Sequence, residues 1–293
     1  MNFEIRRLNV DYPIVQRDAL ALHKKVFPGP DGERQVQHNM LDAPKGTAFF
    51  GAFDGDQLIG GIGFIRHSIV YRRRKMAAFQ ICSTATDPNY RGRGIFSGIV
   101  RHAQTILASE CAFLIGFPNE VAEPIFTGVL GFRKIPLVKI IVPAGYLTSS
   151  TLHPLRVLSK SVTPHQSEHS IYFDQNELIE WKRKPSGRPV SVWSFSGTSI
   201  WGVDLKKRIK GCKFRMYSIG GVDLLESRRS LETMPHRPPL YYTLIATRDS
   251  EVEKAMRFRS MKRPAGIFIY YPMPHFDEAQ PRFEVFGGLA DFF

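Results

Sequence analysis

The sequence predicts an α+β protein made of two similar parts, and three observations support this fold class. The chain has 293 residues, more than a single domain of roughly 100–200 residues requires. Segments in which apolar and polar residues alternate, as in strands, are interspersed with segments whose apolar residues recur at helical spacing. The same order of strands and helices occurs in residues 47–142 and again after residue 190, although residue identities do not repeat. An internal duplication is therefore one hypothesis for the second half.

The N-terminal segment predicts one strand, one helix and a β-hairpin. Residues 2–8 alternate as a strand does, and Tyr12–Val26 has apolar residues at helical spacing. Asp54-Gly55 predicts a tight turn between two strands, because glycine accepts the positive φ that such a turn requires. Strands of the first half are expected at 47–53, 57–70, 76–86, 112–117 and 132–142.

Two further helices are expected between the later strands of this half. From Ile95 to Leu107 the apolar residues form one stripe, as in an amphipathic helix that packs on a sheet. A second helix is predicted over 120–130, and Gly131 marks its end.

Composition divides the chain into three segments. Residues 146–170 are rich in Ser, Thr, His and Pro, which is typical of a linker. The segments on either side, 1–145 and 171–293, each carry strand and helix signals, and we expect one domain in each. In the second, strands are expected at 190–195, 199–203, 213–217, 240–247, 266–271 and 282–286, and helices at 222–233 and 251–261.

The charge balance favours anionic partners. The chain has 40 Lys and Arg against 27 Asp and Glu, for a formal net charge of +13. Residues 1–150 hold 18 of the basic and 12 of the acidic side chains, so the excess is spread over both halves. A nucleic-acid-binding protein more often concentrates its basic residues on one face or segment. We therefore expect small polyanions as partners, and no nucleic acid.

The cysteines and the apolar stretches bear on the cellular compartment. Cys82, Cys111 and Cys212 lie far apart, which argues against a disulfide framework and against a zinc site, so no metal is predicted. The N-terminal residues lack the apolar core of a secretory signal, and no apolar stretch reaches the length of a membrane-spanning helix. We expect a cytoplasmic protein without stable membrane insertion, whose oligomeric state the sequence leaves open.

The run Arg91-Gly92-Arg93-Gly94, between a predicted buried strand and the amphipathic helix, has the features of an anion-binding loop. Glycines let the backbone approach a ligand closely, and the first N–H groups of a helix carry partial positive charge. The arginines add charge and forked donors. The loop lacks the Lys-Ser/Thr of a Walker motif and the third glycine of a dinucleotide fingerprint. A glycine turn with solvated arginines is the alternative interpretation.

This loop and its surroundings resemble the GNAT N-acetyltransferase superfamily. Arg91 and Gly94 match the pattern Arg/Gln-x-x-Gly-x-Gly/Ala of that family's pyrophosphate loop, whereas Phe96 replaces the usual small last residue. Downstream, Asn119-x-x-Ala122 and Leu130-Gly131-Phe132 are similar to two further segments of the family. The resemblance implies a mixed, mostly antiparallel sheet flanked by helices in the first half. It also implies a degenerate, GNAT-like second half.

The family's co-substrate is acetyl-CoA, and the resemblance implies how this chain would hold it. Amides from Arg91 to Phe96 would bind the pyrophosphate, and the strand end at 84–86 would pair with pantetheine. The thioester carbonyl would lie near the Thr86 amide, where an N–H stabilises a developing oxyanion. The implied cofactor-binding residues are Thr84, Ala85, Thr86, Arg91, Gly92, Arg93, Gly94, Ile95, Phe96 and Asn119.

Acyl transfer to an amine requires a neutral amine, and usually a base that removes its proton. Many members of the family use a tyrosine before the Gly-Phe segment as acid, but Phe126 and Thr127 occupy those positions here. Glu123 is the first candidate for the base, and Asn119 completes the predicted catalytic pair. Carboxylates are also favoured near a helix start for structural reasons alone. Weaker candidates are Glu120, His67 and Gln80.

The predicted activity is transfer of an acetyl group from acetyl-CoA to the amine of a small molecule. An amino sugar, or a nucleotide-linked amino sugar, is the first acceptor considered. In the second half, Ile219–Val222 is the nearest equivalent of the glycine loop but lacks the arginine, so we expect this half to shape the acceptor pocket. Two alternatives stay open: a longer acyl group from CoA or an acyl carrier protein, and a noncatalytic acyl-CoA-binding regulatory module.

Overall fold

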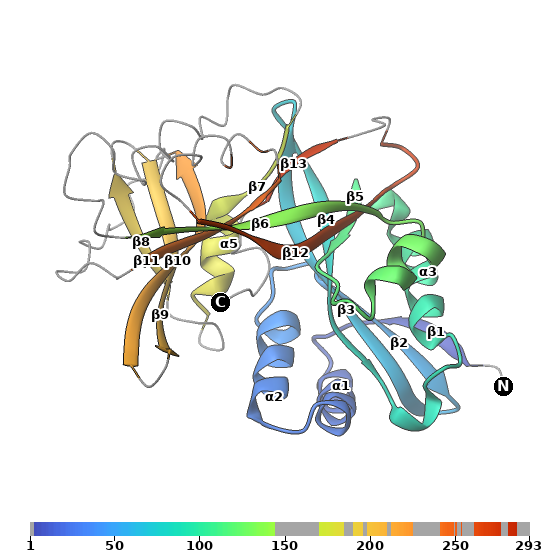
Figure 1. The fold of residues 1–293 in the computed structure, drawn as a ribbon. Coiled ribbons are helices and arrows are strands. Elements are labelled where there is room, and N and C mark those ends of the chain that lie inside the picture. The colour runs from blue at the N-terminus through green and yellow to red at the C-terminus, as the bar shows by residue number, and fades with distance from the viewer. Residues whose placement is uncertain are drawn as a thin grey trace.

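A computed structural model gives the arrangement of the chain (Figure 1). The structure describes residues 3–143, 170–184, 190–195, 198–209, 212–224, 241–248, 250, 253, 261–276 and 281–285. Within these ranges, thirteen strands belong to one sheet. Most neighbouring strands are antiparallel, and helices pack on the sheet, so the predicted α+β fold class is confirmed.

The first half supplies six strands and most of the helices. They are β1 (Glu4–Leu8), α1 (Pro13–Val26), α2 (Pro30–Val36), η1 (Gln37–Leu41), β2 (Ala48–Asp54), β3 (Gln57–Tyr71), β4 (Arg74–Thr86), η2 (Pro88–Tyr90), α3 (Ile95–Ile106), η3 (Leu107–Ser109), β5 (Phe113–Gly116), η4 (Ile125–Val129) and β6 (Arg133–Pro143). The predicted strands, the first helix and the helix after Gly94 are therefore all present, with α2 and η1 in addition.

The second half supplies the remaining strands of the sheet. They are β7 (Ser170–Phe173), β8 (Val190–Phe195), β9 (Thr198–Ile209), β10 (Cys212–Leu224), β11 (Tyr241–Thr247), β12 (Met261–Pro272) and β13 (Arg282–Glu284), with helix α5 (Gln175–Lys182) between β7 and β8. Of the predicted linker 146–170, residues 146–169 lie outside the described residues, and Ser170 begins β7. Most of the helices predicted at 222–233 and 251–261 also lie outside the described residues.

The helix expected from Val222 was wrong, and residues 219–222 belong to a strand. A helix was predicted from Val222, but β10 continues through Leu224 and pairs with β9. The run Ile219–Val222, the nearest equivalent of the glycine loop, lies inside β10 at a register shift. A Cβ on Gly220 would come within 2.4 Å of the Trp201 ring. Glycine is needed there to make room for a tryptophan, not for a phosphate.

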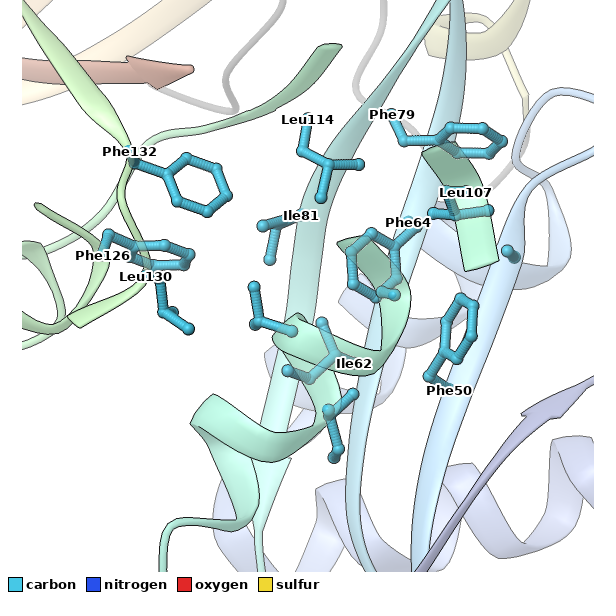
Figure 2. Close-up of a cluster of buried hydrophobic side chains, with 14 of the residues drawn as sticks. Phe50, Ile62, Phe64, Phe79, Ile81, Leu107, Leu114, Phe126, Leu130 and Phe132 are labelled. Atoms are coloured by element: carbon cyan, nitrogen blue, oxygen red, sulfur yellow. The ribbon is translucent and has the colours of Figure 1, made fainter. Parts of the chain in front are cut away.

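The two faces of the sheet are covered by different helices. Phe50 and Phe64 belong to the cluster under α3 (Figure 2). Ile99 of that helix belongs to the same cluster. Successive strand residues point to opposite faces, so Phe49 faces the other way, and it packs with Ala19 of α1. A further cluster on this second face joins α5 to the central strands. The loop that begins α3 is thus held by the first of these cores.

One strand of the second half completes the sheet of the first. β12 lies between β5 and β6 and is antiparallel to both, with Ile269 opposite Gly116 and Tyr270 opposite Arg133. Figure 1 shows this dark red strand beside the green β6. Segments about 130 residues apart in the chain are therefore direct neighbours in the sheet.

Candidate functional site

β4 and β5 diverge at the centre of the sheet. The two strands are parallel and pair only over Ala78–Gln80 and Phe113–Ile115. β5 ends at Gly116, whereas β4 continues to Thr86 with its other edge paired to β3. Residues 84–86 of β4 are the ones expected to pair with pantetheine. On the edge of β4 that faces β5, no described strand pairs with them. Unpaired N–H and C=O groups at this edge can bind an extended ligand.

A bulge in β4 precedes this open edge, and α1 holds it. Ser83 has a positive φ of 43°, and the register with β3 shifts between Gly61 and Gly63. His23 of α1 places Nε2 2.8 Å from the Ser83 carbonyl oxygen and Nδ1 2.9 Å from that of Ala19. Burial lowers the pKa of His23 below its ordinary value. The buried imidazole therefore ties the helix to the bulged part of the strand.

The turn after β4 is fixed by Asp87. Its Oδ1 accepts a hydrogen bond from the Asn89 N–H at 3.0 Å, and its Oδ2 lies 2.5 Å from the Lys25 ammonium nitrogen. The hydrogen bond from Lys25 is the main cause that holds the pKa of Asp87 below its usual range. The carboxylate is only 2% exposed. Asp87 is thus a cap and ion-pair residue, in line with its position before Pro88.

The glycine loop opens directly onto α3. Gly92 and Gly94 have φ values of 75° and 73°, in the left-handed region that side chains disfavour. All four residues of Arg91–Gly94 are exposed, and a Cβ built on either glycine would meet no atom within 4 Å. Gly94 is the N-cap of α3 and has no side chain to bond the first helical N–H groups. The loop therefore presents backbone donors to open space at a positive helix end, as a bound diphosphate requires.

The two arginines of the loop have different surroundings. Arg93 donates to the Asn89 carbonyl at 3.1 Å, and its guanidinium lies 5.0 Å from the centre of the Tyr90 ring. Tyr90 in turn donates to Asp54 at 2.9 Å, which joins the loop to the β2–β3 turn. The exposed Arg91 is at the start of the loop. These contacts brace one side of the loop and leave its glycines accessible.

Phe96, which departs from the family pattern, belongs to the core. Its ring is partly buried and makes an edge-to-face contact with Phe126 at 5.2 Å between centroids. Phe126 also contacts Phe132 at 5.0 Å (Figure 2 labels both). The larger residue thus fills the space between α3 and η4.

The predicted catalytic pair lies just after β5. Asn119 is exposed, and its Oδ1 accepts from the Ala122 N–H at 2.9 Å. Glu123 is partly buried, and its Oε1 lies 2.9 Å from the Lys134 ammonium nitrogen. The Glu123 carbonyl accepts from Thr127 Oγ1 at 3.0 Å. Asn119 is thus a turn cap and Glu123 an ion-pair partner in this structure, and their catalytic roles stay predictions.

His67 and Gln80 pair with each other on the face of the sheet opposite α3. His67 Nε2 donates to Gln80 Oε1 at 2.9 Å, and both residues are buried. The imidazole packs beside Phe173 and Trp181. Burial, above all, lowers the pKa of His67 to about 3. The side chain is therefore a neutral core residue, not an accessible base.

This buried histidine predicts acid sensitivity. The folded-state pKa of about 3 lies below the ordinary 6.5, so the unfolded state binds more protons below pH 6.5 and stability falls as the pH falls. At pH 5 the loss from His67 should be about 2 kcal/mol. In urea unfolding at pH 7 and pH 5, His67→Phe should reduce the loss of stability by this amount, and His23, whose pKa burial also lowers, should account for part of what remains. Replacement of the exposed His275 by Phe should leave the full loss. Equal pH dependence in wild type and His67→Phe would contradict the assignment.

The described part of the chain has neither a cluster of metal ligands nor a membrane-spanning helix. No three His, Cys, Asp or Glu side chains gather as metal ligands there. No helix in that part is long and apolar enough to cross a membrane.

Comparison with known families agrees with this geometry. The sequence model of the acetyltransferase (GNAT) domain matches residues 15–135. Residues 15–135 form a GNAT acetyltransferase domain. The match runs from α1 to the start of β6 and includes the glycine loop, the open edge of β4 and the β5–η4 segment. The chain is thereby placed among the acyltransferases, while no curated protein sequence matches it.

Solved structures extend the likeness in fold to the whole chain. A probable N-acyltransferase from Enterococcus faecalis aligns with a TM-score of 0.60 and 12% identity, over 93% of this chain and 73% of its own. A GCN5-related N-acetyltransferase from Anabaena variabilis aligns with a TM-score of 0.60 and 10% identity, over 93% of this chain and 73% of its own. Eis1 from Mycobacterium abscessus aligns with a TM-score of 0.51 and 12% identity, over 93% of this chain and 74% of its own. At these identities the likeness concerns the fold, which includes residues on both sides of the GNAT domain.

Proposed function

We propose that the protein transfers an acetyl group from acetyl-CoA to the amine of a small molecule. The observation that carries the proposal is the exposed loop Arg91–Gly94, with two left-handed glycines, at the start of α3 and beside the open edge of β4. A diphosphate and an extended pantetheine arm need these two features next to each other. We place the reaction in the cytoplasm, as the sequence predicts.

Acetyl-CoA supplies an activated thioester, and the chain's own groups would bind and orient it. The first N–H groups of α3 and the loop amides would hold the diphosphate, with Arg91 adding charge. The edge of β4 at Thr84–Thr86 would pair with the pantetheine. The Thr86 N–H would stabilise negative charge on the thioester oxygen. Glu123 would accept the amine proton either directly, once its ion pair with Lys134 has opened, or through a water molecule.

The second half would shape the acceptor site. The positive net charge suits an anionic acceptor, and we retain an amino sugar or a nucleotide-linked amino sugar as the first candidate. The division at 145 and 171 is likewise part of this proposal, as a division of roles between two segments that share one sheet and not as two units that fold independently. The two halves share one sheet, in which β12 of the second half lies next to β5.

A noncatalytic acyl-CoA-binding module is the second candidate, and two observations favour it. The position of the family's acid tyrosine holds Phe126, which is buried in the core, and Glu123 is held by Lys134. CoA thiolate is a moderate leaving group, since a thiol pKa is about 8.5, so the missing acid does not forbid turnover.

One pair of experiments tests the proposal. Thermal stability is measured with CoA, acetyl-CoA and longer acyl-CoAs, and free thiol release is then followed over a panel of amines that includes amino sugars. We expect stabilisation by acetyl-CoA and thiol release with at least one amine. Stabilisation without thiol release would support the binding module instead. Stabilisation by none of the CoA compounds would contradict both.

A further inference from the structure

Helix α1 contacts both ends of the open edge of β4. At the start of this edge, His23 Nε2 lies 2.8 Å from the Ser83 carbonyl oxygen. Just beyond its end, the Lys25 ammonium nitrogen lies 2.5 Å from Asp87 Oδ2. Residues 84–86, which are expected to pair with pantetheine, lie between these two contacts. The helix therefore bears on the shape of this edge as well as on the packing of the sheet.

The bulge in β4 explains why the Ser83 carbonyl bonds to a helix. Between Gly61 and Gly63, one residue of β3 stands opposite two residues of β4. Such an insertion disrupts the ladder of hydrogen bonds between two strands locally. Ser83 is 8% exposed, and a buried carbonyl needs a hydrogen-bond partner. The His23 imidazole supplies one from outside the sheet.

The surroundings of the His23 ring assign its proton to Nε2. Burial lowers the pKa of His23, and the neutral ring has one N–H to donate. Nδ1 lies 2.9 Å from the Ala19 carbonyl oxygen. That carbonyl is four residues earlier in α1, so it already accepts the backbone N–H of His23. With the proton on Nε2, the Ala19 carbonyl and the Ser83 carbonyl each have a donor.

The contact that holds the Ser83 carbonyl also fixes the next N–H along the strand. The Ser83 C=O and the Thr84 N–H belong to one planar peptide group. No peptide bond in the described residues is cis, and in a trans group the C=O and the N–H point in opposite directions. Because the carbonyl points toward α1, the Thr84 N–H points away from that helix. This N–H is the first donor of the segment expected to pair with pantetheine.

We infer that His23 is a positioning residue for acyl-CoA. Its Nε2–H holds the Ser83 carbonyl and thereby aims the Thr84 N–H at the pantetheine arm, without touching the ligand itself. His23 is 2% exposed, which agrees with a role exerted through the backbone of β4. The inference rests on the proposed function, because it requires pantetheine to lie along residues 84–86. Binding of the diphosphate at the glycine loop does not depend on His23.

The test compares CoA with 3′-phospho-ADP, which lacks the pantetheine arm, by calorimetric titration of the full chain. We expect the wild type to bind CoA more tightly than 3′-phospho-ADP. His23→Asn keeps an amide near the position of Nδ1 but is too short to reach the Ser83 carbonyl, whereas His23→Gln keeps a donor near the position of Nε2. His23→Asn should lower the preference for CoA about fivefold, which corresponds to one hydrogen bond. It should leave the affinity for 3′-phospho-ADP unchanged, and His23→Gln should keep the preference for CoA.

Leu22→Val is the matched control for looser packing of α1. Leu22 directly precedes His23, is 5% exposed and lies beside Gly61 of β3. Its side chain has no hydrogen-bond donor, so this variant should keep the preference for CoA. Circular dichroism checks that each variant is folded, and undiminished binding of 3′-phospho-ADP shows that the glycine loop is intact.

Three results would overturn the inference. The first is an unchanged preference for CoA in His23→Asn. The second is an equal loss of that preference in His23→Gln or in Leu22→Val, since the effect would then not depend on the Nε2 donor. The third is equal binding of CoA and 3′-phospho-ADP by the wild type, which would leave diphosphate binding intact but remove the contact with pantetheine. Binding of neither compound would contradict the proposed function itself, and this inference with it.

Discussion

Replacing Gly94 with phenylalanine is expected to abolish the stabilisation of the protein by CoA. CoA at about 100 times its dissociation constant should raise the free energy of unfolding of the wild type by about 2.7 kcal/mol. The phenylalanine side chain would project from the loop into the open space where the diphosphate is proposed to lie. It would also force a non-glycine residue into a left-handed conformation at φ 73°. Thermal unfolding with and without CoA measures the loss.

Gly55→Phe is the matched control for this variant. Gly55 has a φ of 59°, and a Cβ there would also meet no atom within 4 Å. The backbone strain, about 1–2 kcal/mol, is therefore similar, but the residue lies in the β2–β3 turn. Gly55→Phe should be destabilised to a similar degree and still respond fully to CoA. An undiminished CoA response in Gly94→Phe would remove the main support for the proposed function.

A fragment of residues 1–145 is expected not to fold cooperatively on its own. It would lack β12, which lies between β5 and β6. The fragment would also lose three side chains that are buried against the first half, namely Phe268, Ile269 and Met273. Burial of each is worth about 1.5–3 kcal/mol, so the loss approaches the 5–15 kcal/mol that stabilises a typical domain. Two measurements check this expectation. Thermal unfolding of the fragment should show no cooperative transition, and its NMR spectrum should show no dispersed amide resonances.

Complementation provides the control for the fragment. When residues 1–145 and 146–293 are produced together as separate chains, β12 can insert and the two should co-purify as a folded complex. The complex should unfold in one transition near that of the intact chain at equal concentration. A fragment 1–145 that unfolds cooperatively by itself would contradict the structural importance of β12.

Local sequence signals were sufficient for much of the first half. The apolar stripe from Ile95 identifies α3 because a helix on a sheet must bury one face. Asp54-Gly55 identifies the β2–β3 hairpin because few residues accept a positive φ. The glycine loop could be predicted for the same reason, since its function depends on backbone conformation. Each of these features depends on residues that are close together in the chain.

Other features had only weak signals in the chain. The helix α2 begins Pro30-Asp31-Gly32, a sequence typical of turns, and its end Val36 packs in the cluster with Ala19. His67 and Gln80 were expected beside the cleft, because strand position alone does not reveal which face is covered by α5. The glycines before Val222 could not be interpreted from the sequence, because a close approach of Trp201 requires the same residue type as a close approach of a ligand.

The fold class, the start of α3 and the loop that could hold a diphosphate could all be predicted from the amino-acid sequence, because helix periodicity and glycine conformation are local properties. Three features became visible in the folded chain alone: β12 completes the sheet of the first half, Lys134 pairs with Glu123, and cationic groups from β6, β13 and the end of β11 line one cavity. These depend on which distant segments become neighbours. Strand pairing is selected by burial across the whole sheet, which no short stretch of the chain contains.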